Sequence, residues 1–330
     1  EATLISDLKE CINLLPASWS GQDLARATSG AAATLLGKIY LRNHDYANAK
    51  TYIDMVLNSG QYELESDFKY VWSENNKYGK EMIFALLHET GNNAAEIACH
   101  FGPSDHPEVP GRWQYYGVSL PFWRSYDKED PRREFFYYDY TGDAKRDDQS
   151  DYGFHYMVPE EGVTVVPNDT TKYMQNVATM KYTYDMISDA YYDGRTICIF
   201  RLSDVILCKA EIENNLNGPA AALPYLNQIR ARAGAPEYGK HNRFPAPSTK
   251  ETMNDAILKE RGYELVFEFQ RRADLIRFGK YEEVVNAHLK KLGIAQPTNV
   301  TSSLRYFPYP LNDAQLNPNL AAENPSRLPK

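Results

Sequence analysis

The chain has 330 residues, a formal net charge of -8 and a hydrophobic content of 43%, which is ordinary for a folded protein. Nucleic-acid binding requires a dense basic patch, and none is visible in the sequence, so we expect no nucleic-acid partner. The longest apolar runs, such as residues 83–87, fall far short of the roughly 20 residues that span a bilayer. Composition therefore predicts a folded protein without a membrane-spanning helix.

Residues 1–64 carry the strongest helical patterns of the first part of the chain. Residues 1–15 place apolar side chains at helical spacing and end before Pro16, which predicts one helix. Residues 27–64 predict two antiparallel helices joined by a polar turn at residues 43–45. Their apolar stripes contain Ala33, Leu36, Gly37 and Tyr40 on the first helix, and Ala49, Ile53 and Val56 on the second. The spacing fits a tetratricopeptide repeat of about 34 residues, and equally an ordinary helical hairpin.

The middle of the chain loses this periodicity. Residues 81–87 predict a buried strand or half a helix, and the regular pattern then stops from residue 89 to about residue 196. Irregular stretches longer than about 12–15 residues are usually functional or disordered. The high aromatic content of this stretch argues against disorder. We therefore expect an ordered, loop-rich segment with a function of its own.

Helical patterning resumes at residue 200 and repeats the earlier spacing. The positions Ala210, Ala222, Leu226 and Ile229 correspond to Gly37, Ala49, Ile53 and Val56 of the first hairpin. Two copies of one spacing favour the repeat interpretation. Gly234 is expected to end the second pair, and Ser248 or Thr249 to begin a further helical stretch that reaches residue 278.

Together these patterns predict a mainly α fold in which tetratricopeptide-like helix pairs carry a long, loop-rich insert. We expect one domain over residues 1–330. Its parts are a helical repeat part at 1–92, a ligand-binding insert at 93–198, a second helical repeat part at 199–292 and an extended C-terminal tail at 293–330.

The segment from Lys259 to Gly279 carries a many-residue signature. It resembles the pattern ER-x-x-EL-x-FE-x-x-R-x-x-DL-x-R-x-G of the SusD/RagB family. Phe269, where that family commonly has Gly, and Arg272 and Ala273, where it commonly has an aromatic pair, are departures. The matching positions are Glu260, Arg261, Glu264, Leu265, Phe267, Glu268, Arg271, Asp274, Leu275, Arg277 and Gly279. Three further segments, at 125–133, 201–211 and 307–325, are similar to other motifs of the family.

The resemblance implies an outer-membrane, cell-surface lipoprotein that binds nutrient glycans. It also implies a partner, a SusC-like TonB-dependent transporter that receives the oligosaccharide. The resemblance covers the chain end to end but only the later two-thirds of a typical member. We expect the protein to associate with the membrane only through a lipid anchor. That anchor is expected to belong to the first third of a typical family member, which this sequence does not include.

The acidic side chains of the signature admit two interpretations. Glu260 and Glu264 could form an acid–base pair, as a helical glycoside hydrolase or lyase would need. However, Arg261 and Arg271 nearby would keep both carboxylates ionised. A general acid must instead carry a proton, so this neighbourhood argues against catalysis. We favour a partly buried ion-pair network that fixes the register of the helices, and we expect no enzymatic activity.

The loop at residues 111–116 is the candidate binding site. Aromatic plates with polar side chains beside them suit the apolar face and hydroxyl rim of a sugar ring. The candidates are Arg112, Trp113, Gln114, Tyr115 and Tyr116, flanked by Trp72, Asn92 and Asn93. The alternative is that the rings hold the loop onto the helices, in which case they would be buried.

Other candidate chemistry is weak. His100, Asp105 and His106 follow no zinc spacing, and Cys11, Cys99, Cys198 and Cys208 follow none either, so we expect no metal and no cofactor. We expect Cys198 and Cys208 to be buried thiols rather than a disulfide. The sequence thus predicts a non-catalytic glycan-binding protein. The alternatives are the hydrolase or lyase named above and a repeat scaffold that binds another protein.

Overall fold

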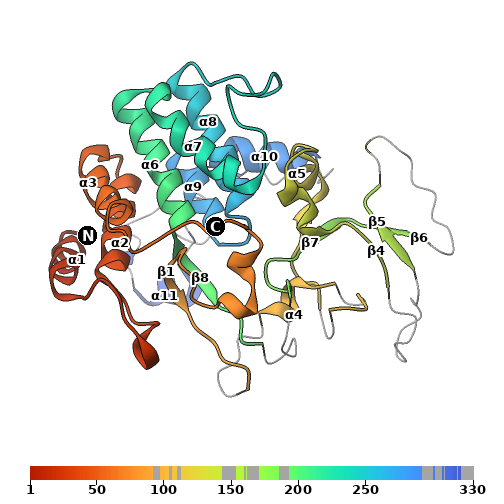
Figure 1. Cartoon of the computed structure of the whole chain (residues 1–330), viewed down its shortest axis with the longest axis horizontal. Helices are drawn as coiled ribbons and strands as arrows, with labels where there is room; N and C mark the ends of the chain where they lie inside the picture. Colours follow the sequence, from red (N-terminus) through yellow and green to blue (C-terminus); the bar gives the residue numbers. More distant parts are fainter. Residues whose placement is uncertain are drawn as a thin grey trace. The chain divides into compact units, whose positions relative to one another are not determined.

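The fold is described from a computed structural model (Figure 1). The structure describes residues 1–91, 97–103, 106–109, 113–142, 154–159, 161, 171–185, 193–291, 300–301, 307, 309–317 and 319–320. The chain divides into two compact units, Glu1–Glu268 and Phe269–Lys330. Among the described residues, no helix is both long and apolar enough to cross a membrane.

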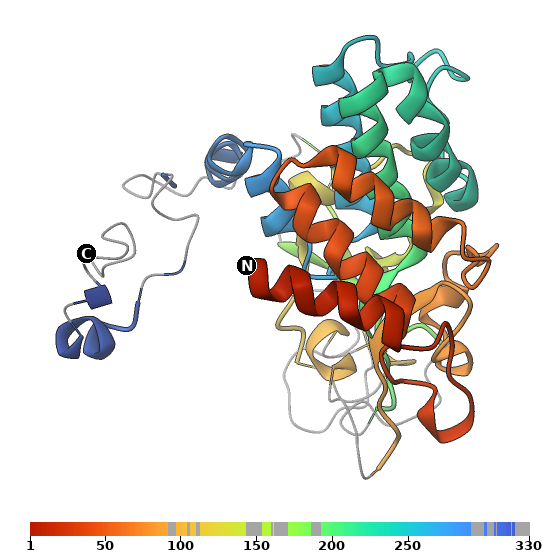
Figure 2. The same cartoon turned by 90° about the vertical axis from the view of Figure 1, so that its left-hand side faces the viewer.

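The first unit begins with three packed helices, α1 (Ala2–Leu14), α2 (Ser29–Arg42) and α3 (Tyr46–Leu57), which lie side by side in Figure 2. The side chains of Thr28 and Asp45 cap the second and third helices by accepting backbone N–H groups. Gly37 faces Ile53 so closely that an added Cβ would lie 3.0 Å from the isoleucine side chain. The predicted hairpin and its close approach are therefore confirmed.

The second hairpin has the same construction. It consists of α6 (Leu202–Asn217) and α7 (Pro219–Ala233), and α8 (Lys250–Glu264) packs against both. Gly218 and Gly234 take positive φ angles of 89° and 72° where the helices end, a conformation that costs glycine little. Thr249 begins α8 with a capping box to Thr252, as expected. Contacts between α3 and α6 join the two hairpins.

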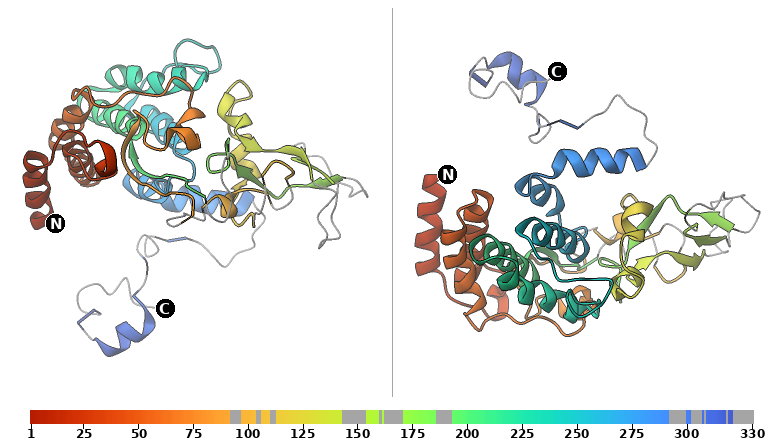
Figure 3. Two further views of the ribbon diagram at one scale, coloured as in Figure 1. Left: turned by 60° about the horizontal axis from the view of Figure 1, so that its bottom comes forward. Right: turned by 90° about the horizontal axis from the view of Figure 1, so that it is seen from above.

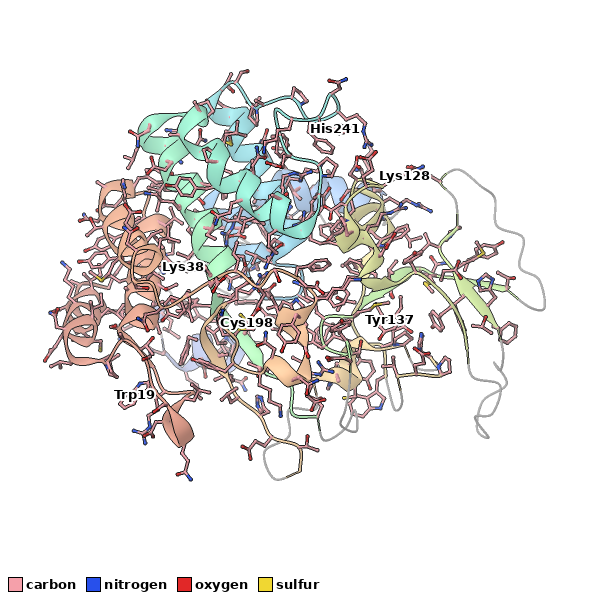
Figure 4. The ribbon with its side chains drawn as sticks, viewed as in Figure 1. Trp19, Lys38, Lys128, Tyr137, Cys198 and His241 are labelled. Carbon is pink, nitrogen blue, oxygen red and sulfur yellow. The ribbon has the colours of Figure 1, made fainter. Side chains whose placement is uncertain are left out.

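Of the two structures expected for residues 81–87, a buried strand or half a helix, the strand is the one observed. Strand β1 (Met82–Leu86) pairs antiparallel with β8 (Ile197–Arg201), the strand that leads directly into α6. Between them in sequence lies the insert, so its two ends are held together by this pairing. Figure 4 labels Cys198 on β8 and Lys38 on α2. The Lys38 Nζ contacts the Asp204 carboxylate of α6.

The insert contains short elements that the sequence pattern did not reveal. Two small three-stranded sheets have the strand orders β2-β7-β3 and β4-β5-β6. The described elements are α4 (Ala98–Phe101), β2 (Val118–Ser119), α5 (Leu120–Arg124), β3 (Phe136–Tyr137), β4 (Asp139–Thr141), β5 (His155–Met157), β6 (Thr171–Tyr173) and β7 (Asn176–Thr179). Short 3-10 turns cover Gly21–Asp23, Tyr70–Trp72, Glu74–Asn76 and Pro131–Glu134. Within the first unit, β4–β6 lie away from α1–α3 (Figure 3).

The second unit contains α9 (Arg271–Arg277), α10 (Tyr281–Lys291) and α11 (Leu311–Leu316). The helical stretch expected up to residue 278 is interrupted between α8 and α9. Phe267 and Phe269 there take positive φ angles of 58° and 61°. The tail, expected to be extended, includes the short helix α11, so that part of the expectation was wrong. Pro310 precedes this helix and is compatible with its start.

Candidate functional site

The short helix α4 supports the candidate site. Its first residue, Ala98, donates its backbone N–H to the buried Asp193 carboxylate at 2.9 Å. The same carboxylate accepts the backbone N–H of Arg195, also at 2.9 Å. Burial raises the pKa of Asp193, and the two N–H donors and the Arg195 charge oppose that rise. Asp193 thus fixes α4 to the segment that leads into β8.

Three exposed aromatic side chains gather beside α4, and we call Trp113, Tyr115 and Tyr116 the aromatic platform. Their exposed fractions are 40%, 64% and 52%, so these rings are not buried against the helices. The ring centroids of Trp113 and Tyr115 lie 5.4 Å apart. The backbone of the platform is held to α4, because Trp113 N–H donates to Cys99 O at 2.7 Å and Tyr116 N–H to His100 O at 3.1 Å.

His100 lies at the centre of the platform. Its ring centroid is 5.0 Å from that of Trp113, 5.5 Å from that of Tyr115 and 6.2 Å from that of Tyr116. The sequence singled out this histidine only as a weak metal candidate, so its role here was missed. No spacing signal could have found it, since His100 and Trp113 are brought together only by the tertiary structure.

The other predicted site residues fall into different groups. Gln114 lies between Trp113 and Tyr115 in the sequence, is half-buried and has a positive φ of 48°. Asn92, Asn93 and Arg112 lie outside the described residues.

Trp72 does not join the platform. Its side chain is only 6% exposed, and its ring lies 4.6 Å from the Lys181 ammonium and 5.6 Å from the Arg201 guanidinium. Cation–π contacts of this kind stabilise a core. We therefore leave Trp72 out of the platform.

The signature carboxylates lie in a buried ion-pair network, as the sequence predicts. Glu260 accepts hydrogen bonds from Arg132 at 2.6 Å and from Arg230 at 2.7 Å. Glu264 accepts from Arg132 at 3.0 Å and from Arg201 at 2.7 Å, and it also contacts Arg232. Each of these side chains is at most 5% exposed.

The partners in this network agree only in part with those expected. Asp274 and Arg277 pair at 2.9 Å within α9, at the helical spacing that the sequence suggests. Arg261 of α8 pairs with Asp204 of α6 at 2.7 Å, so other signature charges join different elements.

The charge state of Glu264 follows from these neighbours. Burial alone would raise its pKa, but Arg232, Arg201 and Arg132 outweigh that effect and hold the pKa well below its usual range. A general acid must carry a proton near neutral pH, which this carboxylate does not. The arrangement of Glu264 is that of a structural ion pair.

Metal and thiol chemistry find little support in the described part of the chain. No group of three or more His, Cys, Asp or Glu side chains is placed there to hold a metal ion. Cys11, Cys99, Cys198 and Cys208 form no disulfide with one another, and burial raises the pKa of Cys198 well above its ordinary value. The expectation that Cys198 and Cys208 are buried and unbridged is confirmed.

Comparison with known sequences shows relatives along nearly the whole chain. SusD-like protein P25 of Formosa agariphila is 26% identical over 96% of this chain and 62% of its own length. The starch-binding protein SusD of Bacteroides thetaiotaomicron is 28% identical over 41% of this chain and 22% of its own length. The chain thus spans less than two-thirds of the length of these relatives.

Solved structures share the fold. The surface glycan-binding protein A of Bacteroides thetaiotaomicron, in complex with laminarihexaose, superimposes with a TM-score of 0.72 at 22% identity. The match covers 96% of this chain and 68% of that protein. A sequence profile of the SusD family matches residues 80–326. This chain belongs to the SusD family.

Proposed function

We propose that this protein binds a glycan at the cell surface, without cleaving it, through the aromatic platform. The observation that carries the proposal is the grouping of three exposed rings on a loop held to a fixed helix. Exposed aromatic side chains gathered on one surface commonly mark a binding site. Buried rings would have indicated only loop packing.

The platform suits carbohydrate chemistry. A pyranose ring presents C–H groups on its face and hydroxyls around its rim. The flat rings of Trp113, Tyr115 and Tyr116 can cover the C–H face, while the tyrosine hydroxyls and the nearby Gln114 amide can bond to the rim. An apolar face with a few polar groups beside it is the usual composition of a small-molecule site.

The relatives indicate which glycans to test. One relative is named for starch binding, and one structural neighbour was solved with laminarihexaose. Glucans of the starch and laminarin types are therefore the first candidates for this chain. As in the family, the protein would be an outer-membrane lipoprotein that passes the oligosaccharide to a SusC-like TonB-dependent transporter.

Binding without catalysis agrees with the state of the signature acids. Glu260 and Glu264 are buried and each accepts from at least two arginines, so neither is available to a bound sugar. A glycosidase would need two carboxylates facing the scissile bond. The platform as described consists of aromatic rings around a histidine.

Affinity electrophoresis in gels containing laminarin or soluble starch tests the proposal. We expect at least one glucan to retard the wild type, and Trp113→Ala to lose most of that retardation. Tyr70→Ala is the matched control, because Tyr70 is a similarly exposed aromatic, 44% accessible, outside the platform. Unchanged retardation of Trp113→Ala would refute the site.

Two further measurements test the remaining parts of the proposal. Incubation of the protein with each glucan should release no reducing ends, and release would favour the hydrolase alternative. Co-purification with a TonB-dependent transporter from outer membranes of the source bacterium tests the hand-off.

A further inference from the structure

His100 contacts each ring of the aromatic platform. Its imidazole meets Trp113 edge-on, with an interplanar angle of 84°, and Tyr115 at 63°. It lies nearly parallel to Tyr116, at 24°. Edge-to-face and offset stacked arrangements are the favoured geometries of aromatic pairs. One half-buried side chain therefore touches all three exposed ones.

The imidazole is itself held in place. Cys99 Sγ lies 3.2 Å from His100 Nδ1, and the Cys99 side chain is fully buried. The carbonyl groups of Cys99 and His100 accept the backbone N–H groups of Trp113 and Tyr116. Asp193 anchors the start of the same helix through Ala98. His100 is thus a fixed point on a fixed helix.

The platform side chains have more freedom than this fixed point. Half or more of the surface of Tyr115 and Tyr116 is exposed, and exposed side chains change rotamer readily. A mobile ring loses conformational entropy when a ligand fixes it, and this loss lowers the affinity. A ring that is already oriented before binding does not incur this loss.

We propose that His100 is a positioning residue, which sets the orientation of Trp113, Tyr115 and Tyr116 before the glycan arrives. This inference rests on the proposed function of the platform. His100 acts through the rings it contacts, and the rings contact the sugar. The requirement is for an aromatic side chain of this size at position 100.

Two variants separate positioning from general stability. His100→Ala removes the ring, and His100→Phe keeps an aromatic ring against the platform while losing the contact of Nδ1 with Cys99 Sγ. By isothermal titration with laminarin and soluble starch, we expect His100→Ala to weaken binding about tenfold and His100→Phe to stay within about threefold of the wild type.

A second measurement needs no ligand. The four tryptophans can be labelled as 5-fluorotryptophan, and the ¹⁹F resonance of Trp113 identified by its loss in Trp113→Ala. We expect His100→Ala to shift or broaden the Trp113 resonance and His100→Phe to restore it. Unchanged resonances of Trp19, Trp72 and Trp123 show that the variant is folded.

The outcomes distinguish the two proposals. If Trp113→Ala loses binding while His100→Ala binds as the wild type, the positioning role is refuted. A Trp113 resonance that does not respond to His100→Ala refutes it as well. If Trp113→Ala binds normally, the proposed function fails, and the Trp113 resonance still decides whether His100 orients the ring.

Discussion

The Arg132 guanidinium donates a 2.6 Å hydrogen bond to the Glu260 carboxylate, although 128 positions of sequence separate the two residues. Arg132 belongs to the insert and Glu260 to α8, so this bond joins the loop-rich part of the first unit to its helices. Arg132 also pairs with Asp130 and Glu264, at 2.8 and 3.0 Å. The insert is thus held by buried charges as well as by apolar packing.

Removal of Arg132 should strongly destabilise the protein. Arg132→Met leaves Glu260, Glu264 and Asp130 buried without one of their cations, and breaking a buried pair costs about 3–5 kcal/mol. Urea unfolding followed by circular dichroism measures the loss. Lys80→Met is the control, because its pair with Glu63 is exposed and its removal should leave the midpoint nearly unchanged. Equal midpoints for the two variants would contradict this role for the network.

The pH dependence of Glu264 has a definite sign. Its folded-state pKa is lowered, so its contribution is present above the unfolded-state pKa of about 4.3 and is lost as the pH falls toward the folded-state value. Glu264→Gln mimics the protonated side chain. The difference in unfolding free energy between wild type and variant should therefore be constant near pH 6–7 and shrink below about pH 4. A difference that stays constant down to pH 3 would show that arginine pairing does not lower this pKa.

Gly37 and Ile53 test the close approach of α2 and α3. An added Cβ at position 37 would lie 3.0 Å from Ile53 Cδ1 and Cγ1. Gly37→Ala gains about 1 kcal/mol of helix propensity, but overpacking costs about 1–3 kcal/mol, so we expect a net loss. Ile53→Val removes Cδ1 and should relieve part of the contact, so a double-mutant cycle should give a favourable coupling of at least about 0.5 kcal/mol. Purely additive effects would mean that the methyl group added at position 37 does not press on the Ile53 side chain.

The helix pairs could be predicted from the sequence because their signals are local. Gly37, Ala49, Ala210 and Ala222 recur at fixed spacing, and each faces the neighbouring helix at a buried position. Helical periodicity needs only a window of residues to be visible. The short strands of the insert have two to four residues, too few for an alternating pattern to show.

The signature identified important charges but could not show which of them pair. Its acids bind arginines from other segments, such as Arg132, Arg201 and Arg230. These pairings depend on tertiary structure, which spacing along one helix does not report.

The candidate binding site also depends on tertiary structure that the sequence does not show. The aromatic residues of the loop at 113–116 are evident from composition, whereas the place of His100 among them depends on Asp193, almost a hundred residues away.

Phe269 offers a prediction that separates backbone strain from packing. The family signature commonly has glycine at this position, and here Phe269 takes a φ of 61° with 72% of its side chain exposed. A left-handed conformation costs a residue with a Cβ roughly 1–2 kcal/mol. Glycine also adds conformational entropy to the unfolded chain, so Phe269→Gly should stabilise the protein by up to about 1 kcal/mol.

Phe267 has a similar φ of 58°, but its ring packs 5.0 Å from that of Phe101. Phe267→Gly should therefore destabilise by about 2 kcal/mol or more, because the lost ring packing exceeds the strain relieved. Urea midpoints of the two variants decide the matter, since strain alone would move both midpoints in the same direction.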